Sequence, residues 1–345
     1  MAKNVIITGV TGQDGSHMAD YLLNNTDCKI YGGIRRLSVK NHSNINHIND
    51  PRFELFDFEL TDSHNIQNCI EQIRPDYFIN FAAQSFVAGS WTFPKQTFQT
   101  DATAVLDILE SLRQSAPTCR FYNAGSSEEF GDVIYEPQDE THPLRPRSPY
   151  GASKCAARHL VKVYRDSYNL FAIQGWLFNH EGVRRGEEFV TRKISKGVAR
   201  INHAMENAGI IEPIILGNLD AKRDWSDAED FMSGIWYMLN QDTRRNNFDG
   251  NLREYVLASG NTHTVRDFLE EAFNTIGVNI YHQKGDIDNA FVIIDPDLYR
   301  PAEVTTLTGN PQLAKAELGW VPGISFSELV KKMVNNDAEK CLTLA

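Results

Sequence analysis

A tyrosine and a lysine stand four residues apart in the stretch 148–154, Ser-Pro-Tyr-Gly-Ala-Ser-Lys. On a helix this spacing is about one turn, so both side chains face the same way. A phenol titrates near pH ~10, and a lysine ammonium beside it stabilises the phenolate. Tyr150, helped by Lys154, is therefore suited to take a hydroxyl proton while hydride leaves the neighbouring carbon. Because the same spacing also arises by chance in chains of this length, it gains weight only from its surroundings.

A second candidate site is the glycine-rich run 9–15, Gly-Val-Thr-Gly-Gln-Asp-Gly, which lies between an apolar β-branched stretch and a helical pattern. In such a unit the glycines let the backbone approach a pyrophosphate, and the helix N-terminus offers free N–H groups. A plain glycine turn is the alternative, but the position directly after a first strand favours nucleotide binding. The cofactor-binding residues predicted in this run are Gly9, Thr11, Gly12, Gln13, Asp14 and Gly15.

Two arginines, Arg35 and Arg36, follow the next expected strand, 29–34. An NAD-specific enzyme usually carries an acidic residue at this point to bind the ribose hydroxyls. Guanidinium groups instead match the geometry of phosphate. The pair therefore favours NADP, with its 2′-phosphate, over a solvated basic pair on a loop.

Strand and helix patterns alternate over the first half of the chain, and a polar loop is expected at 37–51. Strands are predicted at 4–8, 29–34, 53–56, 77–81, 120–124 and 171–177, and helices at 63–74, at 98–112 and around Tyr150. This alternation predicts an α/β protein with a Rossmann-type, doubly wound parallel sheet. Polar groups follow the fourth and fifth strands, at the edge where ligands of such sheets lie.

After residue 178 the alternation loosens. A polar turn is expected at 179–186, strands at 211–216, 255–258 and 291–294, and helices at 190–205, 227–239, 264–276, 312–318 and 326–334. We expect residues 1–178 to form the NADP-binding domain and residues 179–345 to form mainly a smaller C-terminal substrate-binding lobe. Segments near 211–240 and 255–260 or 291–294 are expected to return to the first domain.

Composition narrows the possible partners. The 34 basic and 45 acidic residues give a net charge of -11, which argues against nucleic acids and anionic membranes as partners. The five cysteines are scattered, which suggests reduced thiols, and no Cys or His cluster predicts a metal. The chain shows neither a signal peptide nor an apolar stretch of about 18 residues, so we expect a cytoplasmic protein.

Taken together, the glycine run, the Ser126 region and the Tyr150 motif resemble the extended short-chain dehydrogenase/reductase superfamily. Within it, longer motifs are similar to those of the GDP-mannose 4,6-dehydratase family, and they lie at 9–15, 126–128, 146–150, 177–181, 184–193, 216–218, 223–225 and 300–303. The resemblance implies an NADP-dependent lyase that converts GDP-mannose to GDP-4-keto-6-deoxymannose and water. It also implies a homodimer or homotetramer, and a product used to make deoxyhexoses such as GDP-fucose or GDP-rhamnose.

Position by position, the resemblance implies catalytic roles for four residues. Tyr150 is the base at the sugar's 4-hydroxyl, Lys154 lowers the pKa of Tyr150 and holds the nicotinamide ribose, Ser126 bonds the same hydroxyl, and Glu128 takes the proton from carbon 5. Further cofactor contacts are implied for Glu59, Leu60, Ala82, Gln84, Ser85, His180 and Arg185. Substrate contacts are implied for Ser85, Ser126, Glu128, Asn179, Lys193, Gly217, Asn218, Arg223, Arg300 and Glu303.

The chain departs from the family pattern at Ser126, often a threonine, at Glu59, an aspartate, and at Gln96, a tyrosine. The loop 37–43 also differs, which leaves dimer and tetramer open. Two rival functions are an epimerase or reductase acting on a nucleotide sugar, and a non-catalytic NADP-binding regulator. Glu128 beside Ser126 counts against the first rival, because those reactions need no such base. The sequence does not separate mannose from a manno-heptose, which differ only beyond carbon 5.

Overall fold

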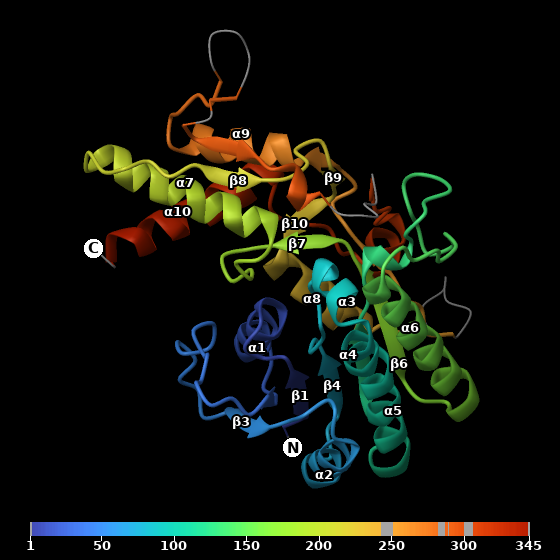
Figure 1. Ribbon diagram of the computed structural model, residues 1–345. Helices are drawn as coiled ribbons and strands as arrows, with labels where there is room; N and C mark the ends of the chain where they lie inside the picture. Colours follow the sequence, from blue (N-terminus) through green and yellow to red (C-terminus); the bar gives the residue numbers. More distant parts are fainter. Residues whose placement is uncertain (1, 243–250, 282–286, 289, 300–305, 344–345) are drawn as a thin grey trace.

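The computed structural model describes residues 2–242, 251–281, 287–288, 290–299 and 306–343. Within these ranges, seven parallel strands form the central sheet in the order β11-β6-β5-β4-β1-β2-β3 (Figure 1). The strands are β1 (Asn4–Thr8), β2 (Lys29–Ile34), β3 (Phe53–Asp57), β4 (Tyr77–Asn80), β5 (Arg120–Ala124), β6 (Ala172–Leu177) and β11 (Val256–Leu257). The predicted Rossmann-type α/β fold is confirmed.

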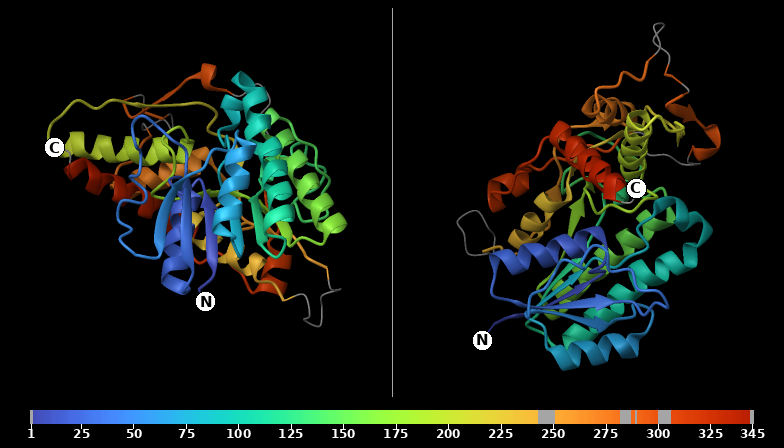
Figure 2. Two further views of the ribbon diagram at one scale, coloured as in Figure 1. Left: turned by 90° about the horizontal axis from the view of Figure 1, so that it is seen from below. Right: turned by 90° about the vertical axis from the view of Figure 1, so that its left-hand side faces the viewer.

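Helices cover both faces of the sheet (Figure 1, Figure 2). Helices α1 (Gln13–Asn25) and α8 (Ala228–Leu239) pack on one face, and α2 (Ser63–Ile73), α5 (Ala104–Ser115) and α6 (Pro149–Tyr168) on the other. Side chains of a strand alternate between faces, so Val5 and Ile7 join the core under α1 and α8, whereas Ile6 joins the core under α2, α5 and α6. A strand buried on both sides therefore reads as a continuous apolar run.

The remaining elements form a second group, which lies above the sheet in Figure 1. Helices α7 (Val190–Glu206), α9 (Val265–Thr275) and α10 (Phe326–Thr343) pack around a core of their own. Strand pairs join this group: β7 (Asn179–Glu181) with β10 (Trp225–Asp227), β8 (Ile214–Leu216) with β13 (Val292–Ile294), and β9 (Lys222–Arg223) with β12 (His263–Thr264). None of the described helices is long and apolar enough to cross a membrane.

Two late segments lie with the central sheet. Strand β11 pairs with β6, and α8 packs against α1 and places Phe231 and Met238 in the core beneath it. Strand β13 instead pairs with β8 outside that sheet.

Some predicted boundaries were wrong. The expected helix 98–112 belongs to a longer helical run of α4 (Pro94–Phe98), a π-helical turn η1 (Gln99–Thr103) and α5, and α3 (Val87–Thr92) precedes it. Residues 179–181 form strand β7 and not the expected turn. The sequence did not predict this strand because its three polar residues show no alternation of polar and apolar side chains. Helix α10 runs nine residues past the predicted end at 334, because the polar Asp337 lies buried on Arg192 and Ser195 instead of facing solvent. Short helices complete the described chain at η2 (Ser127–Glu129), η3 (Pro296–Leu298) and η4 (Ala314–Leu318).

Phe231 offers a test of the core in which α8 packs. Its side chain is fully buried and packs on the rings of His180 and Trp320, at centroid distances of 4.7 and 5.5 Å. We expect Phe231→Ala to lower the free energy of unfolding by about 3–5 kcal/mol in urea denaturation. Tyr237→Ala on the same helix is the control, because Tyr237 is 42% exposed. Equal losses from the two variants would contradict the packing described here.

Candidate active site

A cavity of about 1270 Å³ lies along the carboxyl ends of β1 to β6 and extends to the second group of elements. Most of the predicted site residues line it. They are Gly9, Thr11, Gly12, Gln13, Asp14, Gly15, Arg35, Glu59, Leu60, Ala82, Gln84, Ser85, Ser126, Glu128, Tyr150, Lys154, Asn179, His180, Arg185, Lys193, Gly217, Asn218 and Arg223. Arg36 is exposed and does not line the cavity. Arg300 and Glu303 lie outside the described residues.

The turn after β1 brings backbone close to the cavity. Gly9 has a φ of +66°, and a Cβ on Gly15 would lie 2.4 Å from the Gly9 carbonyl oxygen, so both positions need glycine. Gly12 caps α1 without a side-chain hydrogen bond, which leaves N–H groups of the first turn to face a ligand. These features fit the pyrophosphate of a dinucleotide.

A partly buried ion pair joins this turn to β7. His180 Nε2 lies 2.9 Å from Asp14 Oδ2, and Gln13 Nε2 donates to the His180 carbonyl oxygen at 3.0 Å. Burial alone would raise the pKa of Asp14, but the charge and hydrogen bond of His180 lower this pKa below its usual value. Burial would likewise lower the pKa of His180, and Asp14 raises it instead. The pair therefore holds the nucleotide-binding turn against the strand that carries Asn179 and His180.

The polar loop after β2 also contributes to the cavity, which the sequence did not indicate. Asn41 and Asn44 line it beside Arg35, and Asn44 Nδ2 donates to the Thr11 carbonyl oxygen at 3.0 Å. Because this stretch has no periodicity, only its folded contacts reveal the role. Of the two arginines that follow β2, Arg35 lines the cavity and Arg36 does not.

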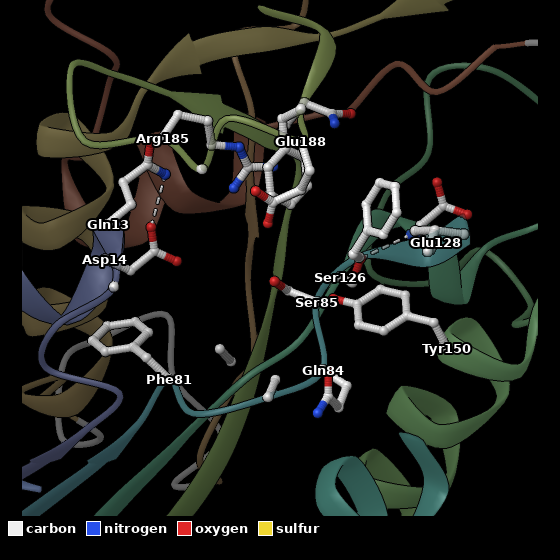
Figure 3. Close-up of a pocket in the computed structure, with 18 of the residues that line it drawn as sticks. Gln13, Asp14, Phe81, Gln84, Ser85, Ser126, Glu128, Tyr150, Arg185 and Glu188 are labelled. Atoms are coloured by element: carbon white, nitrogen blue, oxygen red, sulfur yellow. Dashed lines mark hydrogen bonds between the residues drawn. The ribbon is translucent and has the colours of Figure 1, made fainter. Parts of the chain in front are cut away.

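Ser126, Glu128 and Tyr150 gather where β5 ends and α6 begins (Figure 3). Ser148 caps α6 by accepting the Gly151 N–H at 3.0 Å, which sets Tyr150 in the first turn. The Ser126 hydroxyl accepts the Glu128 N–H at 3.2 Å. Ser85 lies next to Ser126 and Tyr150 in Figure 3, with Glu128 beyond Ser126.

We expected Lys154 to lower the pKa of Tyr150, but in the folded protein this pKa is raised. Burial raises the pKa of Tyr150 well above its usual value, and the negative charge of Asp101 adds to the rise. The Lys154 ammonium donates to the Ala124 carbonyl oxygen at 2.9 Å and lies 5.7 Å from the Tyr150 ring centroid. The spacing did place both residues on one helix face, but it could not predict this backbone bond.

Asp101 is a charged neighbour that the sequence did not single out. It is 1% exposed in the π-helical turn, and its Oδ1 accepts the Gln84 N–H at 2.7 Å. Its Oδ2 has no hydrogen-bond partner among the described residues. Burial raises the pKa of Asp101 to about 6. Its neighbours at 99–103, Gln-Thr-Asp-Ala-Thr, are mostly polar, so the sequence does not distinguish it from an ordinary polar helix residue.

Another wall of the cavity carries four basic residues beside the acidic Glu181 and Glu188. Arg184, Arg185, Lys193 and Arg223 line it, and Arg223 is buried. The Arg185 guanidinium pairs with Glu181 at 3.0 Å and stacks 3.5 Å from the Phe189 ring centroid. Guanidinium and ammonium groups in such a wall suit a diphosphate. Phe189 also meets Phe86 across the cavity, at 6.0 Å between centroids, and the sequence predicted neither aromatic.

Comparisons with known proteins agree with this geometry. The family model described as GDP-mannose 4,6 dehydratase matches residues 6–333. GDP-mannose 4,6 dehydratase 2 from Arabidopsis thaliana is 42% identical over 348 residues, which cover 98% of this chain and 87% of that protein. UDP-glucose 4-epimerase from Thermus thermophilus, solved in complex with NAD, is similar in structure, with a TM-score of 0.80 and 23% identity. That match covers 97% of this chain and 98% of the epimerase and concerns the fold.

Asp101 should make stability depend on pH. Its carboxyl group binds a proton more tightly in the folded than in the unfolded chain, so its contribution is present below pH ~4 and is lost as pH rises through about 6. Relative to Asp101→Asn, the wild type should lose about 2–3 kcal/mol of unfolding free energy over this window. Urea denaturation at several pH values measures the difference. A difference that is flat, or that grows in favour of the wild type with pH, would contradict the assignment.

Proposed function

This chain belongs to the GDP-mannose 4,6-dehydratase family, a family of hydro-lyases, and from this premise we propose that it converts GDP-mannose to GDP-4-keto-6-deoxymannose and water. The observation that carries the proposal is one cavity lined by a tyrosine suited to act as a base, by a carboxylate suited to act as a second base, and by a glycine-rich turn of the dinucleotide-binding type. Tyr150, Glu128 and the turn 9–15 supply these three parts. The turn 9–15, Arg35 and Lys154 would hold a nicotinamide cofactor, which when bound would supply reversible hydride transfer without net redox.

The residues divide the proton transfers between them. Tyr150 takes the proton of the 4-hydroxyl while Ser126 holds the same oxygen. The ketone at carbon 4 acidifies the neighbouring carbon 5, and Glu128 takes that proton as the hydroxyl leaves carbon 6. Two protons taken, from oxygen 4 and carbon 5, balance the two given back, to the leaving hydroxyl and to carbon 5. Lys154, one turn beyond Tyr150 on α6, would hold the nicotinamide ribose.

The finer assignments belong to the same proposal. NADP is supported by Arg35 at the end of β2, and the GDP diphosphate by Arg223 and Lys193 on the wall that carries the four basic residues. We assign the dinucleotide to residues 1–178 together with α8 and β11, and the GDP-sugar mainly to residues 179–345. We also propose a cytoplasmic protein that assembles as a homodimer or homotetramer. Helix α6 presents Val163 and Tyr168 about half exposed, and copies could pack there.

Cofactor choice provides a matched pair of variants. Arg35→Ala should weaken NADP binding by about 10- to 100-fold and leave NAD binding nearly unchanged, because a charge-assisted contact to the 2′-phosphate is lost. Arg36→Ala is the control and should alter neither affinity by more than about twofold. Fluorescence titration with both cofactors measures these constants. Equal losses of NADP and NAD in Arg35→Ala would refute the 2′-phosphate contact.

The base at carbon 5 can be separated from hydride transfer. Glu128→Gln keeps the side-chain shape but removes the base, so elimination should slow by about 100-fold or more while GDP-mannose still binds. Absorbance of bound NADPH and exchange of the carbon 5 hydrogen in deuterated water report the two steps separately. Tyr150→Phe is the contrasting variant and should block the first hydride transfer. Wild-type exchange and product formation in Glu128→Gln would assign the base to another residue.

A further inference from the structure

The turn that carries Ser126 and Glu128 is closed by a second carboxylate, Glu129, which lies outside the cavity lining. Glu129 is fully buried, and its Oε1 accepts the Ser126 backbone N–H at 2.8 Å. The Ser126 hydroxyl in turn accepts the Glu128 N–H at 3.2 Å, and together these bonds form a capping box at η2. Glu129 is therefore one hydrogen bond away from Ser126, and Ser126 is one bond away from Glu128.

Arg158 holds Glu129 from the catalytic helix. On α6, Tyr150, Lys154 and Arg158 follow one another at intervals of four residues, so they share one face. Arg158 Nε lies 2.5 Å from Glu129 Oε2, and the guanidinium stacks 3.5 Å from the Trp176 ring centroid. This pair ties the turn that carries Ser126 directly to the helix that carries Tyr150.

The hydrogen bonds at Glu129 require a carboxylate. Both oxygens act as acceptors: Oε1 receives Ser126 N–H and Gln174 Nε2–H, the latter at 3.1 Å, and Oε2 receives Arg158 Nε–H. An amide at this position offers one acceptor oxygen and one NH₂ donor. Whichever way the amide turns, it must set a donor against either Ser126 or Arg158.

We propose that Glu129, clamped by Arg158, is the positioning residue that fixes Ser126 and Glu128 relative to Tyr150 for the proposed reaction. The inference rests on the function proposed above. A buried ion pair of this kind adds little net stability, because removing both charges from water costs about as much as their attraction returns. Its contribution here is geometric, because it holds the backbone of one reacting residue and the helix of another in a single arrangement.

The same network contains a matched control. Arg158 also pairs with Glu254, through Nη1 and Oε2 at 2.8 Å. Glu254 Oε1 accepts Arg165 Nη1–H at 2.9 Å and the Gln174 N–H at 3.0 Å, so this carboxylate too receives only donors. Glu254 makes no hydrogen bond to residues 126–129 in the described structure. Glu254→Gln therefore creates the same mismatch of donors at the far side of Arg158.

The test compares Glu129→Gln with Glu254→Gln, using kcat per cofactor-loaded chain, KM for GDP-mannose and melting temperature. Both variants should melt earlier. Only Glu129→Gln should lose kcat, by about 10- to 100-fold with KM within about twofold, because misplaced reacting groups cost that much. The Ser126 amide should also exchange with deuterium faster in Glu129→Gln and at the wild-type rate in Glu254→Gln.

If Glu129→Gln does not fold, Glu129→Asp takes its place, because it keeps the charge but is one methylene too short to reach Ser126 and Arg158 together. Equal kcat values in the Glu129 and Glu254 variants, or an unchanged Ser126 amide, would reduce Glu129 to a purely structural role. A wild type inactive on GDP-mannose would instead refute the proposed function, and the Ser126 exchange rates would still test the positioning.

Discussion

The strand order reverses between β1 and β4, and the cavity depends on this reversal. Connections that leave β1 and β4 run to opposite sides of the sheet, so their carboxyl ends open a crevice that no crossover fills. The glycine turn after β1 and the Ala82 to Ser85 segment after β4 form its two sides. Because the sheet is parallel throughout, all the other loops that carry reacting groups leave it at the same edge.

Buried and partly buried ion pairs then fix how these loops sit. Asp14 and His180 join the nucleotide-binding turn to β7, and Glu129 and Arg158 join the catalytic turn to α6. Each pair loses hydration on burial, and the attraction within the pair offsets that cost. In the Glu129–Arg158 pair, removing one partner is costly because it leaves an uncompensated buried charge. The arrangement therefore supplies oriented groups at the site more than it supplies stability.

Much of the fold could be predicted because local patterns decide it. The run 4–8 is apolar on both faces of a strand, and the spacing of Tyr150 and Lys154 places them on one helix face. Contacts made only in the folded chain could not be predicted. Arg35 and Arg36 are identical in type, and only the course of the loop shows that Arg35 reaches the cavity. Asp101 likewise resembles any polar helix residue in the sequence. Only the folded chain shows that it is buried near Tyr150 and Lys154.

The central claim is that hydride leaves carbon 4 and returns to carbon 6 of the same sugar within one cavity. GDP-mannose carrying deuterium at carbon 4, incubated with the purified protein without added cofactor, tests this directly. Mass spectrometry and NMR of the product should show the loss of one water and deuterium at carbon 6. Deuterium that stays at carbon 4, that is lost to solvent, or that appears in a product retaining all its oxygens would contradict the account.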